Sequence, residues 1–147
     1  MNDPAPALDP EEWLLRRLSP RHPLVAIAGG RFRPPSDAFS PSTANGGVSF
    51  NREATLRQHG HPLWDGCPDE SWAVAAIKVK QLVELGLRVS TTPPAPHHAE
   101  AFGLEANGPA WEKRTRKEIA KAARIAVWPH RIITWPPTDT APQGALG

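Results

Sequence analysis

The sequence has a single cysteine, Cys67, and no tyrosine. One cysteine excludes an internal disulfide and a cysteine-rich zinc site. Without tyrosine, the six tryptophans carry most of the large aromatic packing. No apolar run approaches the roughly 18 residues that a membrane-spanning helix needs, so the sequence predicts no membrane span. The acidic first residues contain no signal-peptide core, and we therefore expect a cytoplasmic protein.

Length and composition favour one domain with many irregular connections. A chain of 147 residues is long enough for one hydrophobic core and short for two. Only 39% of the residues are hydrophobic, and 18 prolines interrupt regular structure. We predict a flexible lead at 1–8, one globular domain at 9–135 and a flexible tail at 136–147, which offers little apolar surface to pack. The abundance of alanine, arginine, proline and tryptophan suggests a bacterium with a GC-rich genome.

The clearest helical pattern is the run WAVAAIKVKQLVEL, which predicts a first main helix at about 69–86. At about 100° per residue, its small and apolar side chains fall on one arc. They are Trp72, Ala75, Ala76, Val79, Leu82 and Val83. Gly86 follows, where a glycine can end the helix in the left-handed conformation. Because Val74, Ile77 and Leu85 interrupt the polar side, that side is either covered within the domain or contacts a partner.

A second main helix is predicted at 111–126, and it is strongly basic. Between Glu112 and Arg124 the chain has six basic and two acidic residues, a net of +4 on a chain of formal net charge +2. Most of the cations lie on or beside one face of the helix, namely Lys113, Arg114, Lys117, Lys121 and Arg124. Such a face suits the phosphates of a nucleic acid, an acidic protein surface, or simply solvent. No base-reading motif accompanies it, so nucleic-acid binding would depend on shape.

The rest of the chain alternates short strands with short helical turns. Strands are predicted at 24–28, 31–33, 48–50, 87–89 and 98–102 and within 127–135. Short helices are predicted at 9–18, where Asp9 begins a capping box, around 36–39, and after Asn51. This mixed order predicts an α+β fold with a small mixed sheet of short strands, two main helices and many proline-rich loops.

One candidate catalytic pair is His98 and Glu100. Side chains two residues apart on a strand point to the same face, where a histidine and a carboxylate can transfer protons or bind a metal. His59 and His61 form a similar pair in a loop. No third ligand follows at a recognisable spacing, so we predict neither a metal site nor a cofactor.

A candidate phosphate-binding segment follows the double glycine at 29–30. Arg31 and Arg33 would share one face of a strand, and Ser36 would stand at the start of a helical turn. Arginines and a hydroxyl at a helix start suit a phosphate group. The segment has no Walker lysine and no GxGxxG motif, so helix capping by Ser36 and packing of the arginines over a hairpin explain it better than a phosphate pocket does.

Two hypotheses about function follow. The first is a small non-enzymatic accessory or adaptor protein that binds an acidic protein or a nucleic acid through the basic helix at 112–124. The second is a small enzyme that acts on a phosphate-bearing substrate, as a nucleotide-processing or nuclease-like enzyme does. The second requires Arg33, Ser36, His98 and Glu100 to surround one cleft.

Overall fold

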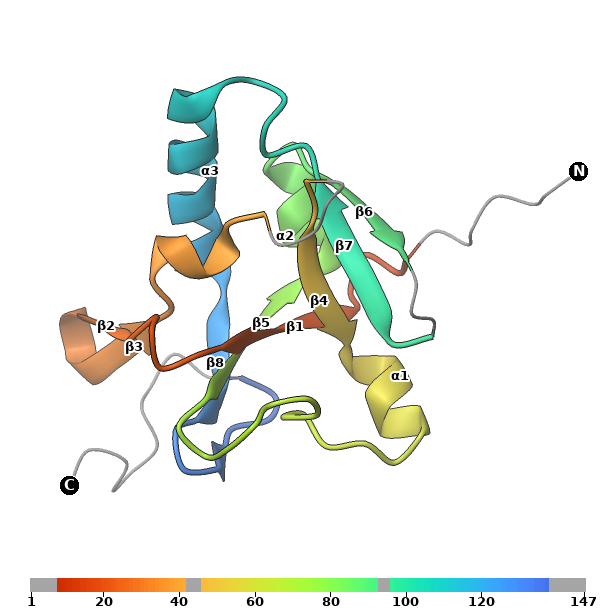
Figure 1. The fold of residues 1–147 in the computed structure, drawn as a ribbon, viewed down its shortest axis with the longest axis vertical. Coiled ribbons are helices and arrows are strands. Elements are labelled where there is room, and N and C mark those ends of the chain that lie inside the picture. Colours follow the sequence, from red (N-terminus) through yellow and green to blue (C-terminus); the bar gives the residue numbers. More distant parts are fainter. Residues whose placement is uncertain (1–7, 42–45, 93–95, 138–147) are drawn as a thin grey trace, which may run out of the picture.

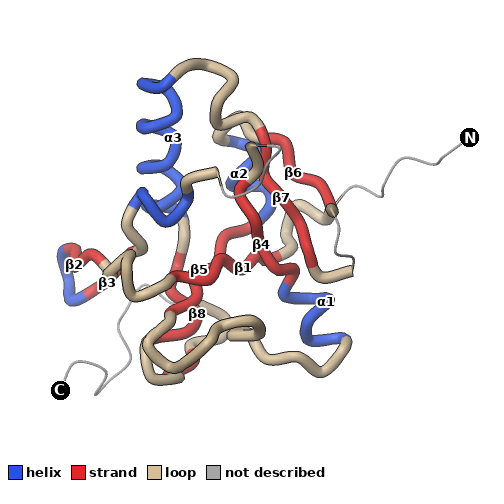
Figure 2. The backbone as a smooth tube through the Cα atoms, in the orientation of Figure 1, coloured by secondary structure: helices blue, strands red, loops and turns tan. Residues whose placement is uncertain are grey.

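The computed structural model describes residues 8–41, 46–92 and 96–137, which form an α+β fold and so confirm the predicted class (Figure 1). Within this part of the chain, seven antiparallel strands form one sheet in the order β6-β7-β4-β1-β5-β8-β9, and β2 and β3 form a separate hairpin. The strands are β1 (Trp13–Leu18), β2 (Val25–Ile27), β3 (Arg31–Arg33), β4 (Val48–Arg52), β5 (Ala73–Lys78), β6 (Arg88–Thr91), β7 (His98–Phe102), β8 (Arg124–Trp128) and β9 (Ile132–Ile133). The helices are α1 (Glu53–Gln58), α2 (Val79–Glu84) and α3 (Pro109–Ala122), with 3-10 turns η1 (Ala28–Gly30) and η2 (Ser36–Phe39) (Figure 2).

Parts of two predicted segments lie outside the described residues. These are positions 1–7 of the predicted lead and 138–147 of the predicted tail. The described end of the chain includes Trp135, whose ring packs edge to face on Trp13 with centres 5.6 Å apart. The domain therefore extends at least to Trp135.

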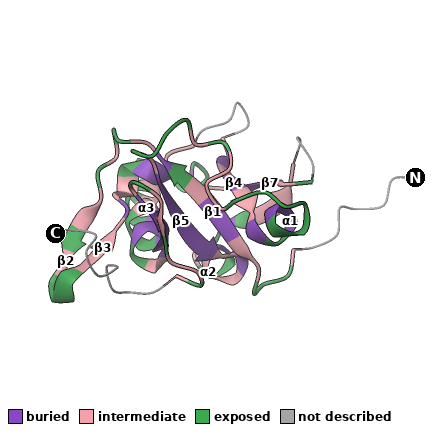
Figure 3. Cartoon of the chain, turned by 90° about the horizontal axis from the view of Figure 1, so that it is seen from below, coloured by how far each residue is buried: buried purple, intermediate pink, exposed green. Residues whose placement is uncertain are grey.

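Strand β5 occupies the centre of the sheet, so the predicted helix at 69–86 is wrong over its first half. Every residue of Ala73–Ile77 is buried, alternately in one or the other of two hydrophobic clusters on opposite faces of the sheet (Figure 3). A strand covered on both faces has no polar side, so its small apolar residues can imitate a helical arc. The helical part of that prediction is α2, and Gly86 follows it with the expected positive φ of 94°.

Strand β1 replaces the short helix predicted at 9–18. The Asp9 side chain accepts a hydrogen bond from the Glu11 backbone N–H at 2.9 Å, so it caps a turn and not a helix. Leu14 and Leu15 are both buried, and they enter opposite clusters. Consecutive buried residues on opposite faces are typical of a central strand, and β1 lies between β4 and β5.

The two faces of the sheet are covered by different elements. One face packs against α2, α3 and η2, which contribute Leu82, Ile119 and Phe39 to the larger cluster. The other face packs against α1 through Leu56 and against the loop that carries Trp64. Each face is thus closed mainly by short segments, as the high proline content predicts.

Helix α3 is shorter than the predicted helix at 111–126. It ends at Ala122, and Arg124 already belongs to β8. The reason is packing, because Ile125, Ala126 and Val127 are all buried in the sheet. At the other end Pro109 occupies the first turn, where its missing N–H costs no hydrogen bond.

Several short predictions are confirmed. β2 and β3 form the predicted hairpin, and Gly29 and Gly30 have positive φ values of 77° and 70° at its tip. η2 is the predicted turn around 36–39, and β4, β6 and β7 match the predicted strands to within a few residues. Asn51, however, lies within β4, so the predicted cap of α1 is wrong and Arg52 occupies that position.

Candidate functional site

Residues of the predicted phosphate segment and of the predicted basic helix line one basic groove between α3 and the β2–β3 hairpin. The groove is a cavity of about 300 Å³ whose polar lining comes from Arg33, Ser36, Lys117 and Lys121. Arg33 and Ser36 belong to the predicted phosphate segment, whereas Lys117 and Lys121 belong to the predicted basic helix. Sequence separation gave no indication that these two segments are neighbours.

Three of the predicted cations have structural contacts that limit their role in binding. Arg124 donates from Nη1 to the carbonyls of Lys121, Ala122 and Ala123 at 3.0–3.2 Å, so it caps the C-terminus of α3. Arg31 donates from Nε to the Ala28 carbonyl at 3.1 Å within the hairpin. Lys121 lies 3.3 Å from the Glu118 carboxylate, although both side chains are more than half exposed.

The remaining cations of α3 form an exposed face. Lys113, Arg114 and Lys117 are exposed, and no carboxylate of the described residues lies within ion-pair distance of them. Arg116, by contrast, points toward η2, where Nη1 lies 3.4 Å from Asp37 Oδ1 and 3.3 Å from Ser40 Oγ. We call Lys113, Arg114, Lys117 and Lys121 the basic face.

The predicted catalytic pair lies elsewhere. His98 and Glu100 share one face of β7, as their spacing predicts, and they stand opposite Asn51 and Ser49 of β4. Glu100 is buried, with its carboxylate against Gly47. Neither His98 nor Glu100 lines the groove that contains Arg33 and Ser36, so the four residues required by the enzyme hypothesis do not surround one cavity.

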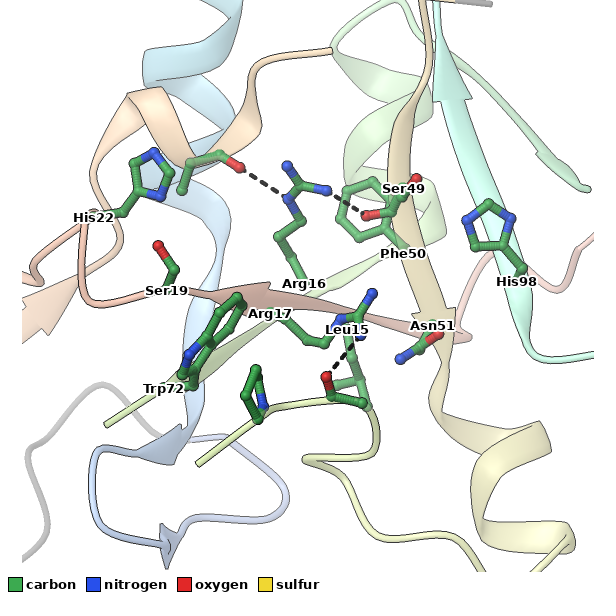
Figure 4. Close-up of a pocket in the computed structure, with 13 residues that line it drawn as sticks. Leu15, Arg16, Arg17, Ser19, His22, Ser49, Phe50, Asn51, Trp72 and His98 are labelled. Carbon is green, nitrogen blue, oxygen red and sulfur yellow. Dashed lines mark hydrogen bonds between the residues drawn. The ribbon is translucent and has the colours of Figure 1, made fainter. Parts of the chain in front are cut away.

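A second cavity, of about 350 Å³, lies where the sheet splits between β1 and β4 (Figure 4). The two strands pair at Leu14–Arg52 and Leu15–Asn51, after which β4 turns away from β1. Arg16 bridges the gap, donating from Nε to the Ala38 carbonyl at 2.9 Å and from Nη1 to the Ser49 carbonyl at 3.0 Å. The side chain thus satisfies a carbonyl of β4 where β1 and β4 have separated.

Two adjacent arginines, Arg16 and Arg17, bring positive charge to this cleft. Burial of the Arg16 guanidinium, helped by the charge of Arg17, lowers the pKa of Arg16 to about 10, so the group stays protonated at neutral pH. Arg17 is exposed and donates from Nη1 at 3.0 Å to the carbonyl of Gly66, which also lines the cleft. Cys67 follows, and burial raises the pKa of its thiol, which makes it a poor nucleophile.

The loop histidines approach His97 and not the predicted pair. The His59 and His61 rings each lie 5.1 Å from the His97 ring, in edge-to-face contacts. Within the described part of the chain, no group of three or more His, Cys, Asp or Glu side chains is arranged to hold a metal ion. No helix there is long and apolar enough to cross a membrane.

Sequence reasoning missed the cleft and its residues Arg16, Arg17 and Trp72. One signal was available, because the segment LLRRL places two adjacent arginines among residues that must otherwise be buried. The helix predicted at 9–18 did not show that these arginines lie on a central strand. Comparisons with protein-family models, with curated protein sequences and with solved structures gave no match, so the geometry alone supports a function.

Proposed function

We propose that this protein is a non-enzymatic accessory protein that binds nucleic acid through the basic face of α3 and the adjoining groove. The observation that carries the proposal is the meeting of Arg33 and Ser36 with Lys117 and Lys121 around one cavity. The helix supplies exposed cations, and the opposite wall adds the guanidinium of Arg33 from β3 and the hydroxyl of Ser36 from η2. Arginine, lysine and serine are the side chains that most often contact phosphate oxygens.

The spacing of the lysines favours a nucleic acid over an acidic protein. Lys113, Lys117 and Lys121 follow one another at four-residue intervals on one helix, so they lie about 6 Å apart along its axis. A nucleic-acid backbone presents charges at regular short intervals, and each neutralised phosphate releases counterions. Carboxylates on a protein surface need not repeat at any fixed interval. We expect binding to depend little on base sequence, because no base-reading motif accompanies α3.

A charge-reversal experiment tests the proposal. Lys113→Glu/Lys117→Glu removes two cations of the basic face, and both positions are exposed. The matched control, Arg21→Glu/Arg88→Glu, makes the same change in net charge at exposed positions far from α3 in sequence. Fluorescence anisotropy with labelled oligonucleotides of unrelated sequences should show at least tenfold weaker binding for the α3 variant and less than threefold for the control.

The same titration distinguishes a nucleic acid from an acidic protein as the partner. Polyglutamate serves as the acidic-protein probe at equal charge concentration and salt. We expect the oligonucleotides to bind more tightly than polyglutamate. Equal losses in the α3 variant and the control, or tighter binding of polyglutamate, would contradict the proposal.

A further inference from the structure

The cleft between β1 and β4 has the composition of an anion site. Its polar lining consists of Arg16, Arg17, Ser19, His22, Asn51 and His98, together with Ser49. None of the described residues that line it is an aspartate or glutamate. Guanidinium, hydroxyl, amide and imidazole groups can all donate hydrogen bonds to an anion. The cavity therefore offers hydrogen-bond donors from four segments of the chain and no competing carboxylate.

Hydrogen bonds within the protein orient three of these donors, of which Arg17 is exposed. Two backbone carbonyls on different elements hold the Arg16 guanidinium, and the Gly66 carbonyl holds that of Arg17. The His98 ring is fixed by a 2.8 Å hydrogen bond between Nδ1 and Thr92 Oγ1. Preorganised donors lose little conformational entropy when a ligand binds, so this arrangement favours specific recognition over loose ion pairing.

The same cavity has an aromatic wall. Trp72 lies beside Arg17 and below Ser19 in the close-up view, and its indole borders the cavity (Figure 4). A flat aromatic surface next to fixed cations suits a ligand that combines a planar ring with a phosphate. The volume of about 350 Å³ is at the small end of the range for ligand pockets, which is about 300–1,000 Å³. A small ring-bearing phosphate is of a size to occupy such a cavity.

We propose that the β1–β4 cleft binds a small ring-bearing phosphate of the size of a nucleoside monophosphate, with its phosphate at Arg17 and its ring against Trp72. The site uses β1, β4, β7 and the 66–72 loop, whereas the basic face lies on α3. A negative result at one of the two sites therefore leaves the proposal for the other unaffected.

Isothermal titration calorimetry with AMP, adenosine and inorganic phosphate tests the site. The full chain should bind AMP more tightly than either fragment, because only AMP fills both halves of the cleft. Arg17→Gln should weaken AMP binding at least tenfold and adenosine binding less than threefold. Trp72→Leu should weaken both AMP and adenosine. Asn51→Ala tests the same cavity if either variant has a lowered Tm, and it should weaken AMP binding about threefold to tenfold.

Two controls separate this site from the basic face. Arg88→Gln removes an exposed arginine outside the cleft and should leave AMP binding unchanged. Lys113→Glu/Lys117→Glu should leave AMP binding unchanged even when it abolishes oligonucleotide binding. No AMP binding at millimolar concentration, or equal affinity in Arg17→Gln, Asn51→Ala and the full chain, would overturn the inference. Loss of AMP binding in the α3 variant alone would overturn it too, since AMP would then bind on α3.

Discussion

The lysines of the basic face and Arg16 of the β1–β4 cleft carry the same charge in opposite environments. Lys113 and Lys117 are solvated, so their charges cost little to maintain and remain accessible to a large partner. Arg16 is mostly withdrawn from water, and its pKa falls to about 10 because burial disfavours its charged form. A buried cation needs fixed partners, and the carbonyls of Ala38 and Ser49 provide them. The exposed lysines of α3 are thus suited to binding a partner, whereas Arg16 also stabilises the fold.

The largest stability effect is expected at Arg16. We expect Arg16→Met to lower the free energy of unfolding by about 2–4 kcal/mol, because two carbonyls lose a charged donor at the split in the sheet. Urea denaturation measures the change. The matched control is Arg21→Met, at an exposed position, which should cost less than about 0.5 kcal/mol. Equal losses in the two variants would show that Arg16 does not hold the cleft together.

Gly47 should be the next most sensitive position. A methyl group there would overlap the Glu100 carboxylate and approach the Phe102 ring to 2.9 Å. We expect Gly47→Ala to destabilise the protein by about 1–3 kcal/mol. In a Glu100→Ala background the same change should cost less, because one of the two overlapping groups is gone. Additive losses in this double-mutant cycle would contradict the placement of Glu100 beneath Gly47.

Substitutions at Arg33 and Arg31 test whether the groove or the tip of the hairpin binds nucleic acid. Arg33→Gln removes a cation that lines the groove, and we expect oligonucleotide affinity to fall about threefold to tenfold with unchanged Tm. Arg31→Gln removes the hydrogen bond to Ala28 instead. It should lower Tm by a few degrees at most and change affinity less than Arg33→Gln does. The reverse order of affinities would place the binding surface at the hairpin tip.

The smallest effect is expected at Glu11, away from both sites. Hydrogen bonds from Lys78 and Lys80, at 2.8 and 2.7 Å, lower the pKa of Glu11 from 4.5 to about 2. A carboxyl with a depressed pKa stabilises the folded state above its unfolded pKa, and the contribution is lost as the pH falls toward 2. The stability difference between the wild-type chain and Glu11→Gln should therefore be small at pH 7 and vanish between pH 4.5 and pH 2. A difference that persists at pH 2 would exclude the ion pairs as its cause.

The fold class was predictable because short strands bounded by glycine and proline are local signals. The β2–β3 hairpin, η2 and β7 all follow from such signals. The centre of the sheet was not predictable in the same way. β5 is buried on both faces, and β1 has adjacent buried residues on opposite faces at Leu14 and Leu15, so neither strand shows simple alternation, and alanine-rich residues at 73–76 imitate a helix. The long-range pairing that decides the matter is not present in a local window of sequence.

The candidate sites show the same limit. The charge pattern of α3 predicted the basic face, because exposed residues on one helix depend only on helical spacing. The same pattern misplaced Arg124, which begins β8 and caps α3. The β1–β4 cleft depends on where two strands separate and which side chain fills the gap, and neither is a property of either strand alone.

The most direct test of the account is the salt dependence of oligonucleotide binding. For duplex DNA, the logarithm of the binding constant should fall linearly with the logarithm of salt concentration, with a slope of about 0.9 per phosphate contact. We predict that Lys113→Glu/Lys117→Glu reduces that slope by about two, whereas Arg21→Glu/Arg88→Glu leaves it unchanged. A slope that is identical in the wild-type chain and the α3 variant would contradict the claim that the basic face contacts a nucleic-acid backbone.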